Sequence, residues 1–94
     1  MSGRYDVLPV VGNDNTLIMY STPWCGYCHR LRSQLDREDI AYRVVDISED
    51  PAAAAYVMSV NGGNQTVPTV QFPDGTALTN PSITRVKEQL ASVS

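Results

Sequence analysis

The chain contains two cysteines, which lie in the run Trp24-Cys25-Gly26-Tyr27-Cys28. Such a pair can cycle between two thiols and one disulfide, because a thiolate attacks a disulfide sulfur through a mixed-disulfide intermediate. In a strand–helix–strand context, the C-x-x-C spacing is typical of thiol redox proteins. We therefore predict thiol–disulfide exchange, with Cys25 and Cys28 as the catalytic residues.

Three further roles for the pair remain open. A structural zinc site needs about four ligands, and the only histidine, His29, is adjacent to the pair and badly placed to join it. A purely structural disulfide would close a very short ring, worth roughly 2 kcal/mol in the loop-entropy model against about 4.7 kcal/mol for a 100-residue loop. Two unrelated buried cysteines would rarely fall at this spacing. Redox chemistry is favoured, and we expect neither a metal site nor a bound cofactor.

The flanking residues place the pair at a strand-to-helix turn. Residues 17–21 form a short apolar run that predicts a buried strand, and Cys28, Leu31 and Leu35 recur at helical spacing. Cys28 should therefore face the core. Cys25 lies ahead of the first helical turn, where its side chain can meet solvent and the free backbone N–H groups.

This position favours the reactive form of Cys25. The thiolate is the nucleophile, and helix N-termini and nearby cations stabilise it. The positive end of the helix dipole should therefore favour an anion at Cys25. Arg30 and Arg32 are further cations close by in the sequence.

Length and composition indicate one globular domain. The chain has 94 residues, of which 43% are hydrophobic and 18% charged. Its net charge of −3 does not indicate the basic surface that binds nucleic acids. We find no signal-peptide pattern and no apolar span near the roughly 20 residues that cross a bilayer. Two cysteines placed together suggest a reducing compartment, so we expect a cytoplasmic monomer without nucleic-acid or membrane partners.

The first half of the chain predicts a parallel βαβ unit. We expect residues 1–16 to form an N-terminal extension, with at most a short strand over residues 7–11, and residues 17–94 to carry the fold. The helix that begins near Cys28 should end at about Glu38, and a second strand should follow over residues 41–47.

The second half predicts a helix, a hairpin and a last helix. Asp50 and Pro51 suit the N-cap and first position of a helix that ends near Val60. Residues 64–72 predict a strand with one buried face, and residues 76–78 should pair with it after a tight turn. A further cap-and-proline pair, Asn80-Pro81, should open the last helix. The predicted class is α/β, a mixed four-stranded sheet with three helices in the order β-α-β-α-β-β-α.

This pattern, with a C-x-x-C turn and a Thr-Val-Pro step before the hairpin, resembles the thioredoxin fold and its glutaredoxin branch in particular. The resemblance covers residues 17–94, and Tyr27 before the second cysteine favours the glutaredoxin side. It implies that Pro68 is cis and faces the cysteine pair, so that the Val67 backbone meets an extended thiol substrate. The substrate-binding residues expected on this basis are Trp24, Tyr27, Thr66, Val67 and Pro68.

The chain departs from glutathione-using glutaredoxins, which carry an acidic residue at the start of the last helix and a basic residue near the first cysteine. Here residues 79–82 read Thr-Asn-Pro-Ser, and residues 22–24 contain no cation. Together with Asn-Gly-Gly-Asn at residues 61–64, these features resemble the mycoredoxins. Their thiol, mycothiol, is a cysteinyl pseudodisaccharide with an acetylated amine and an amide-linked carboxyl. The resemblance implies that Thr79 and Asn80 contact this thiol; helix capping is their alternative role.

The function implied is that of a thiol–disulfide oxidoreductase that releases mycothiol from mixed disulfides. Cys25 would attack the mycothiol sulfur, and a second mycothiol or Cys28 would resolve the intermediate. Expected partners are mycothiol as co-substrate, mycothiolated proteins and, indirectly, mycothiol disulfide reductase. Two alternatives are a thioredoxin-like dithiol reductase of protein disulfides and a glutaredoxin that bridges an iron–sulfur cluster through Cys25.

Overall fold

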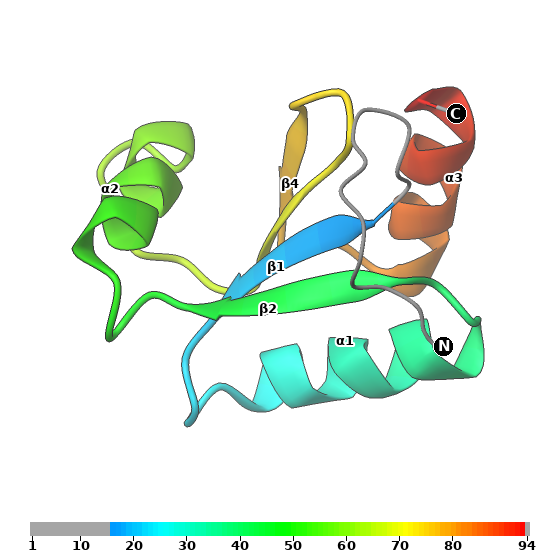
Figure 1. Ribbon diagram of the computed structural model, residues 1–94, viewed down its shortest axis with the longest axis horizontal. Helices are drawn as coiled ribbons and strands as arrows, with labels where there is room; N and C mark the ends of the chain where they lie inside the picture. The colour runs from blue at the N-terminus through cyan, green and yellow to red at the C-terminus, as the bar shows by residue number, and fades with distance from the viewer. Residues whose placement is uncertain (1–15, 94) are drawn as a thin grey trace, which may run out of the picture.

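The computed structural model describes residues 16–93, which form a four-stranded sheet with helices on both faces (Figure 1). The predicted extension at residues 1–16 therefore lies outside the described residues, except for Thr16. The elements are β1 (Leu17–Ser21), α1 (Gly26–Arg37), β2 (Tyr42–Asp46), α2 (Pro51–Val60), β3 (Thr69–Gln71), β4 (Ala77–Thr79) and α3 (Ile83–Val93). This order confirms the predicted β-α-β-α-β-β-α arrangement. No helix in residues 16–93 is long and apolar enough to cross a membrane.

The sheet has the strand order β2-β1-β3-β4. β1 runs parallel to β2 and antiparallel to β3, and β4 returns antiparallel to β3. The α/β class and the mixed sheet are thus as predicted. β1 and β2 both point toward α2 (Figure 1), and the turn that carries the cysteines leaves the sheet at this end of the central strand β1.

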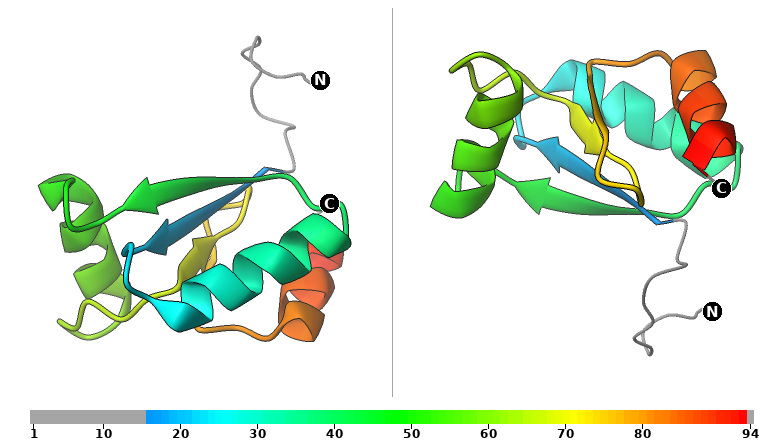
Figure 2. Two further views of the ribbon diagram at one scale, coloured as in Figure 1. Left: turned by 90° about the horizontal axis from the view of Figure 1, so that it is seen from below. Right: turned by 90° about the horizontal axis from the view of Figure 1, so that it is seen from above.

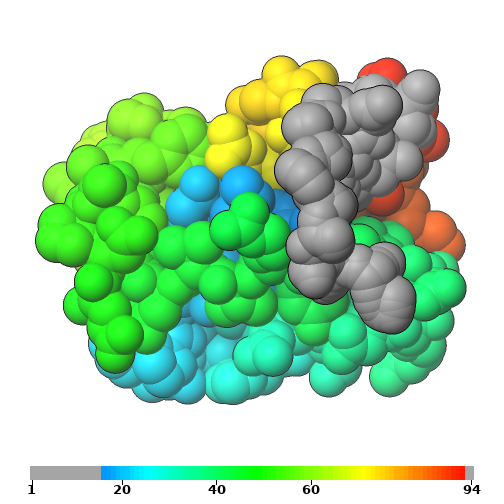
Figure 3. Space-filling view, in the orientation of Figure 1, coloured from blue at the N-terminus to red at the C-terminus, as the bar shows by residue number. Residues whose placement is uncertain are grey.

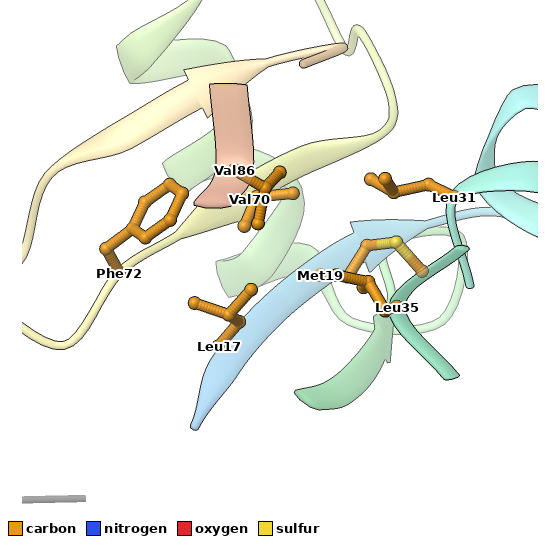
Figure 4. Close-up of a cluster of buried hydrophobic side chains, with 7 residues drawn as sticks. All are labelled: Leu17, Met19, Leu31, Leu35, Val70, Phe72 and Val86. Carbon is orange, nitrogen blue, oxygen red and sulfur yellow. The ribbon is translucent and has the colours of Figure 1, made fainter. Parts of the chain in front are cut away.

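One face of the sheet is covered by α1 and α3, which lie beside each other when the molecule is seen from below (Figure 2). The apolar side chains between these helices and the sheet form the larger core cluster (Figure 4), made of Leu17, Met19, Leu31, Leu35, Val70, Phe72 and Val86. Leu31 and Leu35 belong to the helical repeat that the sequence indicates. This repeat anchors α1 and fixes the direction in which the cysteine turn leaves the sheet.

The other face is covered by α2, which packs through Ala53 and Val57 against Tyr20 and Ile47. α2 begins as predicted, because the Asp50 side chain accepts a hydrogen bond from the Ala53 N–H at 3.1 Å. Burial of polar N–H groups at a helix start is costly unless a cap of this kind satisfies them.

The start of α1 differs from the sequence-based expectation by two residues. The helix begins at Gly26 rather than near Cys28, and Cys25 is its N-cap. At its other end Glu38 is the C-cap and Asp39 has a positive φ of 60°, which agrees with the predicted end of the helix.

The predicted strand over residues 64–72 is too long, because only Thr69–Gln71 pair in the sheet. Residues 64–68 form a loop instead. The prediction of a single buried face is also wrong, since Thr69 has no exposed surface. Asn61, at the end of α2, covers this strand and donates a hydrogen bond to the Thr69 hydroxyl at 3.1 Å.

The start of α3 also differs from the prediction. Ser82, not Asn80, is the cap: its hydroxyl oxygen accepts a hydrogen bond from the Arg85 N–H at 3.1 Å. Asn80 adopts a positive φ of 47°, and its N–H donates to the Pro68 carbonyl at 2.7 Å. Asn80 therefore ties the hairpin to the loop that precedes β3.

Candidate active site

Cys25 lies where the sequence indicates, at the N-terminus of α1. Its sulfur accepts a hydrogen bond from the Cys28 N–H at 3.2 Å, which satisfies one of the free donors of the first helical turn. The side chain is half-buried. The turn between β1 and α1 forms the lower left corner of the molecular surface, coloured blue to cyan (Figure 3). Cys25 can therefore meet a disulfide while a backbone donor stabilises its charge.

Cys28 faces the core, as predicted, and only 1% of its surface is exposed. Burial, then its hydrogen bond with Cys25 and the charge of that thiolate, raise the pKa of Cys28 to about 12, whereas a hydrogen bond with the Thr22 backbone lowers it. Cys28 therefore keeps its proton at neutral pH. It can donate this proton toward the sulfur of Cys25, so the pair consists of a half-buried nucleophile and a fully buried thiol.

The loop before β3 brings the Thr-Val-Pro step to the nucleophile. The Val67–Pro68 peptide is cis, and the Val67 carbonyl oxygen lies 3.8 Å from the sulfur of Cys25. The Thr66 carbonyl accepts a hydrogen bond from the Thr69 hydroxyl at 2.8 Å. Three of the predicted substrate-binding residues, Thr66, Val67 and Pro68, thus form one segment, and its backbone reaches the reacting sulfur.

Asn80 and Tyr27 line a common pocket of about 280 Å³ between the first turns of α1 and the start of α3. The lining residues are Tyr27, Arg30, Leu31, Gln34, Asn80, Pro81, Ser82 and Ile83. Thr79 lies one residue before the pocket, and its hydroxyl donates a hydrogen bond to the side chain of Asn61. Of the two predicted hairpin residues, the structure therefore brings Asn80 to the pocket and to the Pro68 carbonyl, whereas Thr79 pairs with Thr69 and its side chain faces Asn61.

Arg30 and Gln34 are pocket residues that sequence reasoning did not assign to the substrate site. The signal was present, because Tyr27, Arg30 and Gln34 follow the helical spacing i, i+3 and i+7. Arg32, the other cation that the sequence places near Cys25, has a different position. Arg32 interacts with Tyr42, and it does not line the pocket beside Tyr27.

Comparison with known proteins agrees with this geometry. The glutaredoxin family model matches residues 17–76. A glutaredoxin-like protein of Mycobacterium tuberculosis is 56% identical over 77 residues, which cover 82% of this chain and 92% of that protein. Mycoredoxin 1 of Corynebacterium glutamicum is 43% identical over 67 residues, 71% of this chain and 82% of that protein. The chain belongs to the glutaredoxin family.

A solved structure supports the assignment. A glutaredoxin from Archaeoglobus fulgidus superposes with a TM-score of 0.65 at 25% identity, over 81% of this chain and 86% of that chain. The thioredoxin fold is thus confirmed. The protein is a glutaredoxin-like thiol–disulfide oxidoreductase, and it acts on thiol substrates.

In this glutaredoxin two aromatic side chains flank the nucleophile. Trp24 is 75% exposed and Tyr27 64% exposed, so each presents a large apolar surface to solvent beside Cys25. The turn that holds Trp24 is itself fixed, because the His29 ring donates through Nε2 to the Pro23 carbonyl at 3.0 Å. The exposed apolar surfaces of Trp24 and Tyr27 therefore agree in position with the predicted substrate contacts on either side of Cys25.

The contrast between the two cysteines predicts selective alkylation. Burial and the neighbouring Cys25 sulfur raise the pKa of Cys28 to about 12, so its thiolate is scarce at neutral pH. Brief treatment of the folded, reduced glutaredoxin with iodoacetamide should therefore modify Cys25 alone, as peptide mass spectrometry would show. Modification of Cys28 should increase as the pH rises toward 12. In denaturant both cysteines should react, and double modification of the folded protein at neutral pH would contradict the assignment.

Proposed function

We propose that this glutaredoxin releases mycothiol from mixed disulfides. The Cys25 thiolate attacks the mycothiol sulfur, the disulfide bond breaks, and the substrate protein leaves with the electron pair as a thiolate that takes a proton from water. The new bond joins Cys25 to mycothiol. A second mycothiol thiolate then attacks the mycothiol sulfur of this bond, which forms mycothiol disulfide and releases the Cys25 thiolate. Alternatively, Cys28 loses its proton and attacks the sulfur of Cys25; the bond to mycothiol breaks, mycothiol leaves as a thiol with that proton, and a Cys25–Cys28 disulfide forms.

The observation that carries the proposal is the lining of the pocket beside Tyr27. Asn80 and Ser82 present an amide and a hydroxyl at the start of α3, and none of the acidic side chains in residues 16–93 lines the pocket. A free γ-glutamyl ammonium would have no carboxylate partner among these lining residues. An acetylated amine carries no charge and needs only neutral hydrogen-bond partners. The 43% identity to mycoredoxin 1 supports the same choice.

One charge in the pocket modifies the expectation of a fully neutral site. Among the described residues Arg30 is the cation that lines the pocket, so it is available to a carboxylate or to sugar hydroxyls. Glutathione has two carboxylates and one ammonium, and these lining residues offer a partner of opposite charge to only one of the three groups. Mycothiol requires none, because its cysteine amine is acetylated and its cysteine carboxyl is part of an amide bond.

The wider assignment follows from this chemistry. We propose mycothiol as co-substrate, mycothiolated proteins as substrates, and mycothiol disulfide reductase as the enzyme that regenerates mycothiol. We also propose a cytoplasmic monomer that works without a bound cofactor. A reducing compartment suits a chain whose two cysteines form one exchanging pair.

Turnover of a model mixed disulfide with mycothiol or glutathione as reductant tests the proposal. We expect kcat/KM to be at least roughly tenfold higher with mycothiol, since an unpaired charged group costs about 1.5–3 kcal/mol. N-acetylcysteine amide is a matched control thiol, because it shares the acylated cysteine but has no sugar. Equal turnover with glutathione would refute the choice of thiol and leave the role of Cys25 intact.

A further inference from the structure

The side chain of Asn61 joins three segments around the thiol site. Its Nδ2 donates to the Val57 carbonyl at 2.8 Å and to the Thr69 hydroxyl at 3.1 Å. Its Oδ1 accepts a hydrogen bond from the Thr79 hydroxyl. Asn61 thereby links the end of α2, the strand after the cis proline, and the hairpin residue that precedes Asn80.

The chemistry of the partners fixes the direction of each of these bonds. The Val57 carbonyl can only accept, so the amide nitrogen of Asn61 must point toward it. Thr69 donates its single proton to the Thr66 carbonyl at 2.8 Å, so toward Asn61 it can only accept. Both protons of the amide are then used, and the amide oxygen faces Thr79.

Thr79 must therefore be the donor in its bond with Asn61. A hydroxyl has one proton and two lone pairs, and the proton of Thr79 is committed to the Asn61 oxygen. Thr79 is exposed, so its remaining lone pairs can reach a ligand. Toward that ligand Thr79 can accept a hydrogen bond but cannot donate one.

We propose that Asn61 is a specificity-determining positioning residue that makes Thr79 an acceptor-only contact for the bound thiol. This inference rests on the proposed function and on the contact between Thr79 and the thiol that the resemblance to mycoredoxins implies. Carboxylates have no proton to give at neutral pH and would face the lone pairs of Thr79. Amide N–H and sugar O–H groups are donors and suit it. The hydrogen-bond direction set by Asn61 thus favours a neutral, donor-rich thiol over one with carboxylates.

The test is the ratio of kcat/KM for mycothiol to kcat/KM for glutathione. Asn61→Ala releases the Thr79 proton, which can then be donated to a carboxylate. The ratio should fall roughly 3- to 10-fold, the worth of one hydrogen bond. A merely structural loosening of the loop at residues 64–68 would lower both rates together and leave the ratio unchanged.

A double-mutant cycle separates action through Thr79 from other effects. Thr79→Val removes the hydroxyl and keeps the side-chain shape, so it should lower the ratio by itself. Adding Asn61→Ala to Thr79→Val should change the ratio no further. If Asn61→Ala leaves the ratio unchanged, or changes it as much with Thr79→Val present as without it, the inference is wrong.

The two proposals fail in different ways. A wild-type protein that uses both thiols equally would refute the choice of mycothiol, while a drop in the ratio on Asn61→Ala, absent in the double variant, would still support the role of Asn61. If Asn61→Ala does not fold, Thr79→Val decides alone. An unchanged ratio in that variant overturns the inference, and a lower ratio supports it.

Discussion

Replacement of Cys25 by serine is expected to abolish turnover, lowering kcat/KM by roughly 10³-fold or more, as loss of an enzyme nucleophile does. The serine hydroxyl does not ionise near neutral pH and cannot form a disulfide. Cys28 cannot substitute for the missing sulfur, because it is buried, and burial alone already raises the pKa of its thiol. Release of mycothiol from a labelled mixed disulfide would measure the loss.

The same substitution should leave the fold intact, since serine is among the best N-cap residues and can accept the hydrogen bond that the Cys28 N–H now donates to Cys25. The urea unfolding midpoint of Cys25→Ser serves as the control. Residual turnover above a few per cent of the wild-type value, in a folded variant, would show that Cys25 is not the nucleophile.

Cys28→Ser is expected to separate two activities. Release of mycothiol should persist, with mycothiol and its reductase as electron source, because attack and resolution on this route need only the sulfur of Cys25. The rate can exceed that of the wild type, since the competing Cys25–Cys28 disulfide no longer forms. Reduction of ordinary protein disulfides should be lost, because that reaction needs two thiols in one site.

Both activities can be measured on the same preparation, with a mycothiolated peptide and with a disulfide-linked protein as substrates. If Cys28→Ser loses mycothiol release as completely as Cys25→Ser does, the monothiol route is wrong. The thioredoxin-like dithiol mechanism would then be the better description of this glutaredoxin.

The parts of the fold set by local periodicity could be predicted from the sequence. Leu31 and Leu35 repeat with Cys28 on one face of α1, and that repeat alone distinguishes the buried Cys28 from the more accessible Cys25. The Asp50 cap of α2 is equally local. The position of Pro68 beside Cys25 required the resemblance to glutaredoxins, because no local pattern relates residues so far apart in the chain.

Predictions failed where contacts between distant segments decide the structure. Thr69 is polar and lies in an alternating pattern, which predicts a solvent-facing residue. Instead Thr69 is buried, and the Asn61 amide donates a hydrogen bond to its hydroxyl. Asn80-Pro81 matches the pattern that begins a helix. In the structure the Asn80 N–H donates to the Pro68 carbonyl, and Ser82 is the N-cap of α3. Arg30 joins the pocket only because α3 packs against α1.

The strand order decides when the two parts of the active site come together during synthesis. Cys25 belongs to the β1–α1–β2 half, whereas Val67, 42 residues later, arrives with the half that contains β3. The two meet only when β3 pairs with β1 at Tyr20 and Thr69. A nascent chain that has emerged no further than α2 already carries both sulfurs, but it lacks the Val67 backbone that lies beside Cys25 in the complete fold. The complete site around Cys25 therefore requires the second half of the chain.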